Sequence, residues 1–378
     1  MLDIDEEKTI DYMKKLIEIP TENPPGENYR EIIQEIQSFL EPYEIKSEIV
    51  EVNRKQNLIA KIEGIKEKPT LLLNGHVDVV PPGNGWETDP FQAVIKNKRV
   101  YGRGSSDMKG GLAAMISAME SIADSDIEIK GNLIFIASVD EEIGGMDGLG
   151  YLMKRNMVNA DLCLVGEPTK LDIVTAEKGV LWIRIGVKGK SAHASLPEKG
   201  INAIERASSI IKALSEIEYK KSHPLLGKPT INVGKIRGGT KVNVVPDYCE
   251  IEIDRRIIPG EDIEEVKKEI IENLKGEECS IEYFLHAKPF EIEKDSEPVL
   301  RLKKIIKDIT NKEPRIKGIF GFTDARFAYE KGITPIVFGP GSANQAHTAN
   351  EYVEIEQVIN AAKIYALFAT DFLNKSRD

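Results

Sequence analysis

The sequence predicts an α/β fold, in which a mainly parallel sheet with helices on both faces is interrupted by an inserted ferredoxin-like α+β domain. Strand-like apolar runs alternate with helical patterns over most of the chain, which is typical of a parallel sheet covered on both sides. Between residues 178 and 292 the order changes to strand, helix, two strands, helix and strand, which is the ferredoxin-like order. A chain of 378 residues is long enough for two domains.

The first part of the α/β domain begins with two helices. Apolar residues recur at helical spacing over residues 5–18 and 27–43, and the segment TENPPG at residues 21–26 separates them. Helical patterns also follow Asp107 and Gly145. Strand-like runs cover residues 57–62, 69–75, 131–139 and 161–166. We therefore expect a sheet whose strands are connected by helices.

The inserted domain is expected at residues 178–292. Its strands are predicted at residues 180–187, 230–236, 242–257 and 280–287, and its helices at 202–217 and 262–274. Polar and apolar residues alternate over 248–254, which indicates a sheet with one solvent-exposed face. The α/β pattern then resumes with a helix at 298–310, a strand at 333–338 and a helix at 355–372. Residues 1–177 and 293–378 should thus form one discontinuous domain.

Composition argues against several classes of partner. A net charge of -11 and a pI near 5.3 disfavour nucleic acid and anionic membrane, which require clustered Lys and Arg. No apolar run reaches transmembrane length, and the acidic N-terminus does not resemble a signal peptide. Cys163, Cys249 and Cys279 are odd in number and widely spaced, which favours reduced thiols. We therefore expect a cytoplasmic protein that acts on a small molecule.

Metal-binding residue types follow several of the predicted strands. Loops at the carboxyl ends of parallel strands meet at one edge of a sheet, so residues distant in sequence converge there. Two imidazoles and several carboxylates at such positions suggest a hydrolytic metal centre. The residues concerned are His76, Asp107, Glu141, Glu142, Glu167 and His347.

Each candidate also has a purely structural interpretation. His76 and Asp78 lie two positions apart on extended chain, so Asp78 can accept the second ring N–H of a metal-bound His76, or it can be a turn residue before Pro81. Asp107 lies in a glycine-rich loop that opens a helix, where it is either an N-cap or a metal ligand. A phosphate loop is excluded there because Asp107 occupies the third glycine position of G-x-G-x-x-G.

The acidic run at residues 140–142 is the most discriminating evidence for a metal site. Asp140, Glu141 and Glu142 follow an apolar strand and repel one another unless cations compensate them, although exposed acid runs are usually solvated loops. At the edge of a sheet, one carboxylate can bind metal while its neighbour activates water. Glu167 can be a turn acid before proline, and His347 follows the strand-like run at 335–338, so both can reach the same edge.

These residues and their surroundings resemble a known enzyme family. The motifs GHVDVVP, YGRGSSDMKGG, DEEIGG, GEP, GKSAHAS and HTANEYV occur in this order along nearly the whole chain. They are similar to those of the two-zinc amidohydrolases and exopeptidases, a family that includes acetylornithine deacetylase, succinyl-diaminopimelate desuccinylase, aminoacylase and glutamate carboxypeptidase.

The resemblance implies two Zn²⁺ per chain, for which Co²⁺ or Mn²⁺ could substitute. His76, Asp107 and Glu167 would hold one ion, and Asp107, Glu142 and His347 would hold the other. Asp78 would orient His76, and the Asp107–Met108 peptide would be cis. Glu141 would be the general base that takes a proton from the metal-activated water.

The family also implies roles for the inserted domain, as a lid and dimerisation domain. His193 would stabilise the oxyanion, reaching the active site of the other subunit of a homodimer, although by itself it reads as a turn histidine. Asn243 and Arg256 would hold a substrate carboxylate, and Thr323 would line the pocket. The expected reaction is hydrolysis of the amide bond of an N-acyl amino acid, as in acetylornithine deacetylase or succinyl-diaminopimelate desuccinylase. A dipeptidase or carboxypeptidase acting on short peptides, and a non-catalytic metal- or ligand-binding protein, remain as alternatives.

Overall fold

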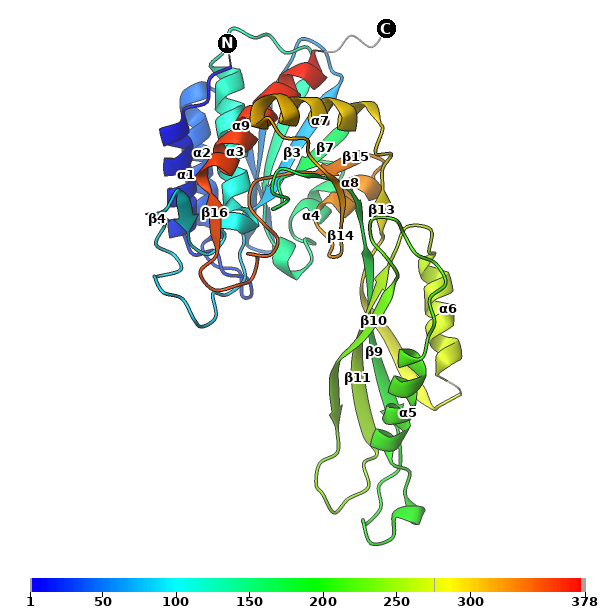
Figure 1. The fold of residues 1–378 in the computed structure, drawn as a ribbon. Helices are drawn as coiled ribbons and strands as arrows, with labels where there is room; N and C mark the ends of the chain where they lie inside the picture. The colour runs from blue at the N-terminus through cyan, green and yellow to red at the C-terminus, as the bar shows by residue number, and fades with distance from the viewer. Residues whose placement is uncertain (1, 275, 375–378) are drawn as a thin grey trace. The chain divides into compact units, whose positions relative to one another are not determined.

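The chain forms two compact units in the computed structural model, which describes residues 2–274 and 276–374 (Figure 1). Unit 1 contains the described residues up to Thr175, the segment Ile292–Lys317, and the described residues from Thr323 onward. Unit 2 contains Ala176–Glu291 and Gly318–Phe322. The sequence had assigned Gly318–Phe322 to the first domain. The segment belongs to unit 2 in the structure, where the backbone N–H of Lys178 donates to the carbonyl of Ile319, 3.1 Å away.

The central strands of unit 1 belong to a sheet with the strand order β1-β2-β6-β3-β7-β15-β8-β13, in which β14 (Ile316–Ile319) also pairs with β8. By residue range, β13 is part of unit 2. The central strands are parallel: β6 (Asn132–Ser138), β3 (Thr70–His76), β7 (Leu162–Val165) and β15 (Thr334–Val337). The outer strands are antiparallel to their neighbours: β1 (Lys46–Val52), β2 (Lys55–Ile62), β8 (Ile173–Glu177) and β13 (Phe290–Glu291). The prediction of a mainly parallel sheet is confirmed, and the antiparallel strands lie toward its edges.

Helices bury the central strands on both sides. Every residue of β3 and β6 is buried, which requires cover on both faces of the sheet. Helix α3 (Gly110–Ala123) packs against α1 (Glu6–Glu18) and α9 (Ile355–Leu373), and its small and apolar side chains allow it to be buried on all sides. The remaining helices of this unit are α2 (Tyr29–Leu40), α4 (Leu149–Lys154), α7 (Glu297–Thr310) and α8 (Ala325–Glu330).

A small three-stranded sheet brings two distant loops of unit 1 together. Strand β16 (Tyr352–Glu354) pairs with β5 (Arg99–Tyr101), which also pairs with β4 (Val94–Lys96). Tyr352 lies opposite Tyr101 in this register. The segment that precedes β16 therefore lies beside the glycine-rich loop that follows β5.

Unit 2 has the predicted β-α-β-β-α-β order. Its elements are β9 (Gly179–Lys188), α5 (Ala203–Ser215), β10 (Thr230–Gly238), β11 (Tyr248–Ile257), α6 (Ile263–Asn273) and β12 (Cys279–Ala287), and its antiparallel sheet has the order β10-β11-β9-β12. Asn202 and Asp262 cap the two helices. The prediction of strand over 242–247 was wrong, because this segment is a loop that contains Pro246, which cannot donate to a sheet. Among the described residues, no helix is long and apolar enough to cross a membrane.

Candidate metal centre

The parallel strands of unit 1 deliver the predicted residues to one edge of the sheet. His76 is the last residue of β3, and Glu167 follows the end of β7 by two residues. Glu141 and Glu142 begin the helical turn η3 (Glu141–Ile143) after β6. Asp107 lies in the segment Ser105–Lys109 that leads into α3, and its peptide bond to Met108 is cis, as the resemblance implied.

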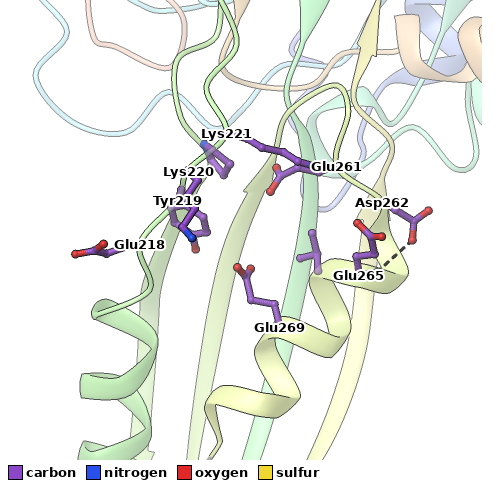
Figure 2. Close-up of a pocket in the computed structure, with 10 residues that line it drawn as sticks. Glu218, Tyr219, Lys220, Lys221, Glu261, Asp262, Glu265 and Glu269 are labelled. Carbon is purple, nitrogen blue, oxygen red and sulfur yellow. Dashed lines mark hydrogen bonds between the residues drawn. The ribbon is translucent and has the colours of Figure 1, made fainter.

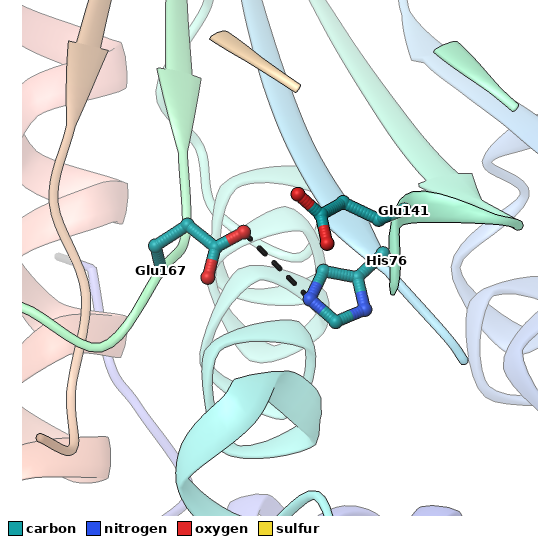
Figure 3. A group of neighbouring side chains, drawn as sticks. All are labelled: His76, Glu141 and Glu167. Atoms are coloured by element: carbon teal, nitrogen blue, oxygen red, sulfur yellow. Dashed lines mark ion pairs between the residues drawn. The ribbon is translucent and has the colours of Figure 1, made fainter. Parts of the chain in front are cut away.

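His76 lies at the middle of this group. Its Nε2 is 3.3 Å from Asp107 Oδ1 and 3.7 Å from Glu167 Oε1. Figure 3 shows Glu141 and Glu167 flanking the imidazole ring. Potential ligand atoms of His76, Glu141 and Glu167 all lie within 4.8 Å of one another, and so do those of His76, Asp107 and Glu142. The two groups overlap at His76, so all five residues belong to one cluster of potential ligands.

His347 reaches the same centre from the loop after β15. Its Nε2 lies 3.0 Å from Glu142 Oε2 and 3.6 Å from Asp107 Oδ2. Its side chain is 56% exposed, whereas that of His76 is 2% exposed. Asp107 thus has one carboxylate oxygen toward each histidine, which is the arrangement expected of a ligand shared by two cations.

The donor set fits metal ions. His76 Nε2 and Glu167 Oε1 are buried and have no hydrogen-bond partner among the described residues, although a buried polar atom is normally paired. Burial raises the pKa of Glu141 and of Glu167 well above the usual range for a carboxyl, and neighbouring carboxylates add to this. A bound cation would stabilise the ionised forms. Imidazole mixed with carboxylate oxygens suits zinc and other divalent transition metals.

Asp107 differs electrostatically from its neighbours. Burial by itself would raise its pKa, but the neighbouring imidazole of His76 and the charge of His347 hold the pKa of this carboxyl below its usual value. The pKa of His347 shifts in the opposite direction, because its hydrogen bond to Glu142 raises the pKa of the imidazole. Asp107 is therefore the member of the group that most readily remains a carboxylate.

Asp78 supports both strand ends. The Nδ1 of His76 lies 2.9 Å from the backbone carbonyl of Asp78 and 3.6 Å from its carboxylate, to which the sequence had assigned this contact. The carboxylate accepts hydrogen bonds from the backbone N–H groups of Glu141 and Glu142, at 3.2 and 3.1 Å, and from the Nδ2 of Asn23, at 2.9 Å. Asp78 therefore fixes the acidic loop as well as the imidazole.

The acidic run is divided between two environments. Asp140 has the left-handed φ of 73° and forms an ion pair of 2.5 Å with Lys55 of β2, whose ammonium also contacts Asp147 at 2.9 Å. Glu141 and Glu142 instead belong to the candidate metal groups. The repulsion among the three acids is thus reduced by a lysine on one side, which the sequence did not reveal because Lys55 is 85 residues away.

The sequence assigned no role at the site to Arg326, Asp324 or Lys109, which lie around α8 and α3. Arg326 donates from Nη2 to the carbonyl of Gly144, 2.5 Å away, and Asp324 accepts from Ser138 at 3.0 Å. Lys109 is completely buried, and its ammonium donates to the carbonyl of Ile19 at 2.7 Å. These contacts have no signature in local sequence, except that charged residues stand inside otherwise apolar segments.

Three of the predicted substrate-site residues belong to unit 2. His193 is exposed, with Nδ1 2.7 Å from Ser195 Oγ, and its backbone forms a bridge with Val244. Asn243, also exposed, accepts the N–H of Ala194 with its carbonyl at 3.1 Å, so the His193 and Asn243 loops are adjacent. Arg256 pairs with Asp254 at 2.8 Å. The roles of these residues remain predictions.

Thr323 belongs to unit 1. It is buried, and its hydroxyl accepts the N–H of Ala325 at 3.1 Å at the start of α8. Its predicted contact with substrate remains a prediction.

A separate polar pocket in unit 2 contains none of the predicted site residues. Its wall includes Glu261 and Glu269 (Figure 2). Both carboxylates pair with the buried Arg255, at 2.7 and 3.4 Å. Tyr219 lies over the guanidinium of Arg255, 4.4 Å from it. These contacts account for Glu261 and Glu269 as ion-pair partners of Arg255 within the unit.

A match to peptidase family M20/M25/M40 spans residues 72–371. The chain belongs to this family. It is 34% identical to an uncharacterized metallohydrolase of Methanococcus maripaludis over 95% of this chain and 98% of the relative. It is 32% identical to succinyl-diaminopimelate desuccinylase of Nautilia profundicola, over 94% and 97% of the two chains. The chain is also 30% identical to N-formyl-4-amino-5-aminomethyl-2-methylpyrimidine deformylase of Halalkalibacterium halodurans, over 97% and 95%.

Solved structures share the fold over nearly the whole chain. The M20 family metallo-carboxypeptidase Sso-CP2 of Sulfolobus solfataricus superposes with a TM-score of 0.81 at 22% identity, covering 97% of this chain and 99% of that one. The YXEP protein of Bacillus subtilis, described as a dinuclear metal-binding M20 peptidase, superposes with a TM-score of 0.73 at 19% identity, covering 97% and 98%. The protein is thus an M20 metallohydrolase, and the expectation of an enzyme of this family is confirmed.

Proposed function

We propose that this enzyme hydrolyses the amide bond of an N-acyl amino acid at a centre of two zinc ions. His76, Asp107 and Glu167 would hold one ion, and Asp107, Glu142 and His347 the other. The observation that carries the proposal is the position of Asp107, whose two carboxylate oxygens lie 3.3 and 3.6 Å from the Nε2 atoms of His76 and His347. The unpaired buried atoms of His76 and Glu167 support it.

Glu141 would be the general base. Zinc ions bound here would acidify a water molecule and polarise the acyl carbonyl. Glu141 belongs to the group of His76 and Glu167, and its backbone is held by Asp78, so its carboxylate can take a proton within this group and later deliver it to the departing amine. Glu142 is less suited to this role, because its carboxylate already contacts His347 at 3.0 Å.

Unit 2 would supply the substrate contacts. Arg256 Nη1 is buried and has no hydrogen-bond partner among the described residues, which suits a guanidinium that receives a substrate carboxylate. We propose that Asn243 assists it, that Thr323 lines the pocket, and that His193 stabilises the oxyanion across a homodimer formed through unit 2. The exposure of His193 within its own chain is compatible with such a role.

The family supports narrower alternatives for the substrate. The desuccinylase and deformylase relatives favour removal of a small acyl group from an amine, whereas the carboxypeptidase neighbour favours a peptide. A non-catalytic binding protein is disfavoured, because Glu141 stands beside a complete ligand set and a binding protein has no need of a base there. We therefore place acyl amino acids first and dipeptides second.

The test is amine release by metal-free protein reconstituted with Zn²⁺ or Co²⁺. The panel contains N-acetylornithine, N-succinyl-diaminopimelate, a formylated aminopyrimidine and simple dipeptides. We expect turnover of an acyl amino acid, its loss in Glu141→Ala with two metals per chain retained, and normal activity in the exposed control Glu18→Ala. Activity that survives in Glu141→Ala would refute the assignment of the base, and preferential cleavage of dipeptides would refute the deacylase assignment.

A further inference from the structure

Glu351 is a fully buried carboxylate that accepts four hydrogen bonds. Its Oε2 accepts from Arg103 Nη1 at 2.6 Å and from the backbone N–H of Gly104 at 3.1 Å. Its Oε1 accepts from the backbone N–H groups of Ser106 and Asp107, at 2.8 and 3.0 Å. The exposed fractions of the Arg103 and Glu351 side chains are 1% and 0%. One side chain thus holds three backbone N–H groups of the glycine-rich loop, including that of Asp107 itself.

The same glutamate ends the loop that carries His347. Glu351 follows His347 by four residues, and its backbone carbonyl accepts the N–H of Gly102 at 3.0 Å. A second connection joins the two loops, because Ser106 Oγ accepts the N–H of Ser342 at 2.8 Å. Glu351 therefore ties the loop of one histidine to the loop of the shared aspartate.

Only a carboxylate satisfies these four donors. Each oxygen of Glu351 accepts two N–H groups, and a glutamine has one acceptor oxygen and one NH₂ donor. In a Glu351→Gln variant, the side-chain NH₂ group would replace one of the two oxygens. In either orientation of the amide, it would then face two of the four N–H donors. Buried donors left without acceptors are costly, so the loops would have to move apart.

The two proposed metal positions depend on these loops to different degrees. The position with His76 and Glu167 has two ligands at the ends of β3 and β7, which the central sheet fixes directly. The position with His347 has only Glu142 from the turn that follows a central strand, while both His347 and Asp107 belong to loops that Glu351 joins. Loss of Glu351 should therefore disturb the second position more than the first.

We infer that Glu351 is a positioning residue for the metal position formed by Asp107, Glu142 and His347. The inference rests on the proposed two-metal function. It adds that the metal affinity of one position depends on the buried carboxylate of Glu351 more than the affinity of the other position does. Its role is to hold two ligand loops together, and it has no contact with the reacting atoms.

The experiment is a Co²⁺ titration of metal-free protein, followed by calorimetry and by visible absorption. The variants are Glu351→Gln and the control Glu354→Gln, which makes the same change three residues along, in the partly exposed ion pair between Glu354 and Arg99. Wild type and Glu354→Gln should bind two Co²⁺ per chain. Glu351→Gln should bind one ion as wild type does and the second at least about tenfold more weakly, as is typical when the support of a ligand is removed.

Each other result has a definite meaning. Two ions bound as in wild type by Glu351→Gln, or equal weakening of both, would overturn the inference. Fewer than two ions in wild type would instead overturn the proposed two-metal function, and the inference with it. If Glu351→Gln does not fold, Arg103→Lys replaces it: weakening of the second ion alone supports the inference, and unchanged binding of both ions overturns it.

Discussion

The carboxylate of Asp78 accepts a hydrogen bond from the backbone N–H of Glu142, 3.1 Å away. Through this bond the end of β3 fixes the first turn after β6, so the residue two positions after one candidate ligand also positions another. The acidic loop is therefore oriented by a buried acceptor and by a lysine, while its two glutamates remain directed to the centre.

Replacing Asp78 with Asn should reduce turnover without unfolding the chain. Asn keeps one acceptor oxygen and loses the other, so one of the N–H groups of Glu141 and Glu142 loses its partner. We expect kcat/KM to fall by about 10–100-fold, measured on the best substrate of the panel. The control is Asp172→Asn, which weakens an ion pair with Arg315 elsewhere in unit 1. Equal activity of the two variants would show that the Asp78 bonds are dispensable.

Arg326 should be needed for the geometry of the same loop. It donates to the carbonyl of Gly144 at 2.5 Å, at the end of the turn that contains Glu141 and Glu142. Replacement by Met leaves this buried carbonyl without its charged donor, so we expect kcat to fall by about tenfold or more. Arg301→Met, which removes a surface pair with Asp371, is the matched control. A kcat equal to that of the control would contradict the prediction.

Lys109 should make the stability of metal-free protein depend on pH. Burial lowers the pKa of its ammonium from 10.5 to about 7. Between these values the unfolded chain binds a proton that the folded chain does not, so the free energy of unfolding rises with pH. Relative to Lys109→Met, wild type should gain up to about 1.4 kcal/mol per pH unit from pH 7 to 9, measured by urea unfolding. A constant difference between the two proteins, such as that expected for exposed Lys96→Met, would contradict the prediction.

Mixed inactive chains should recover activity if His193 acts across a homodimer. Glu141→Ala and His193→Ala chains would each be inactive alone, and a heterodimer would contain one complete site. Random reassortment should restore about a quarter of wild-type activity, because half of the dimers are heterodimers with one of two sites intact. The measurement requires chains with different tags, so that heterodimers are quantified. Heterodimers without activity would show that His193 acts within its own chain, and full activity of His193→Ala alone would show that His193 is dispensable.

The alternation of strands and helices could be predicted because the spacing of apolar residues and the length of apolar runs differ between strands and helices. The runs that became β3, β6 and β7 were recognisable as apolar segments, since central parallel strands are buried on both faces. Three other strands lack a long apolar run. Strand β1 is partly exposed along its length, and β8 and β13 have only five and two residues. The start of β11 was misplaced because the loop before it is also rich in valine.

The sequence by itself determined the types of side chain at the ends of the central strands, and the family to which those motifs belong. Only the tertiary structure decided how the acids are supported: Asp140 by Lys55, Asp78 by backbone N–H groups, and Glu351 by the loop of Asp107. The physical reason is that ligand positions follow from strand ends, which local patterns reveal. Their supporting hydrogen bonds join segments up to about 250 residues apart, as in the 248-residue separation of Arg103 and Glu351, and no local pattern records such a pairing.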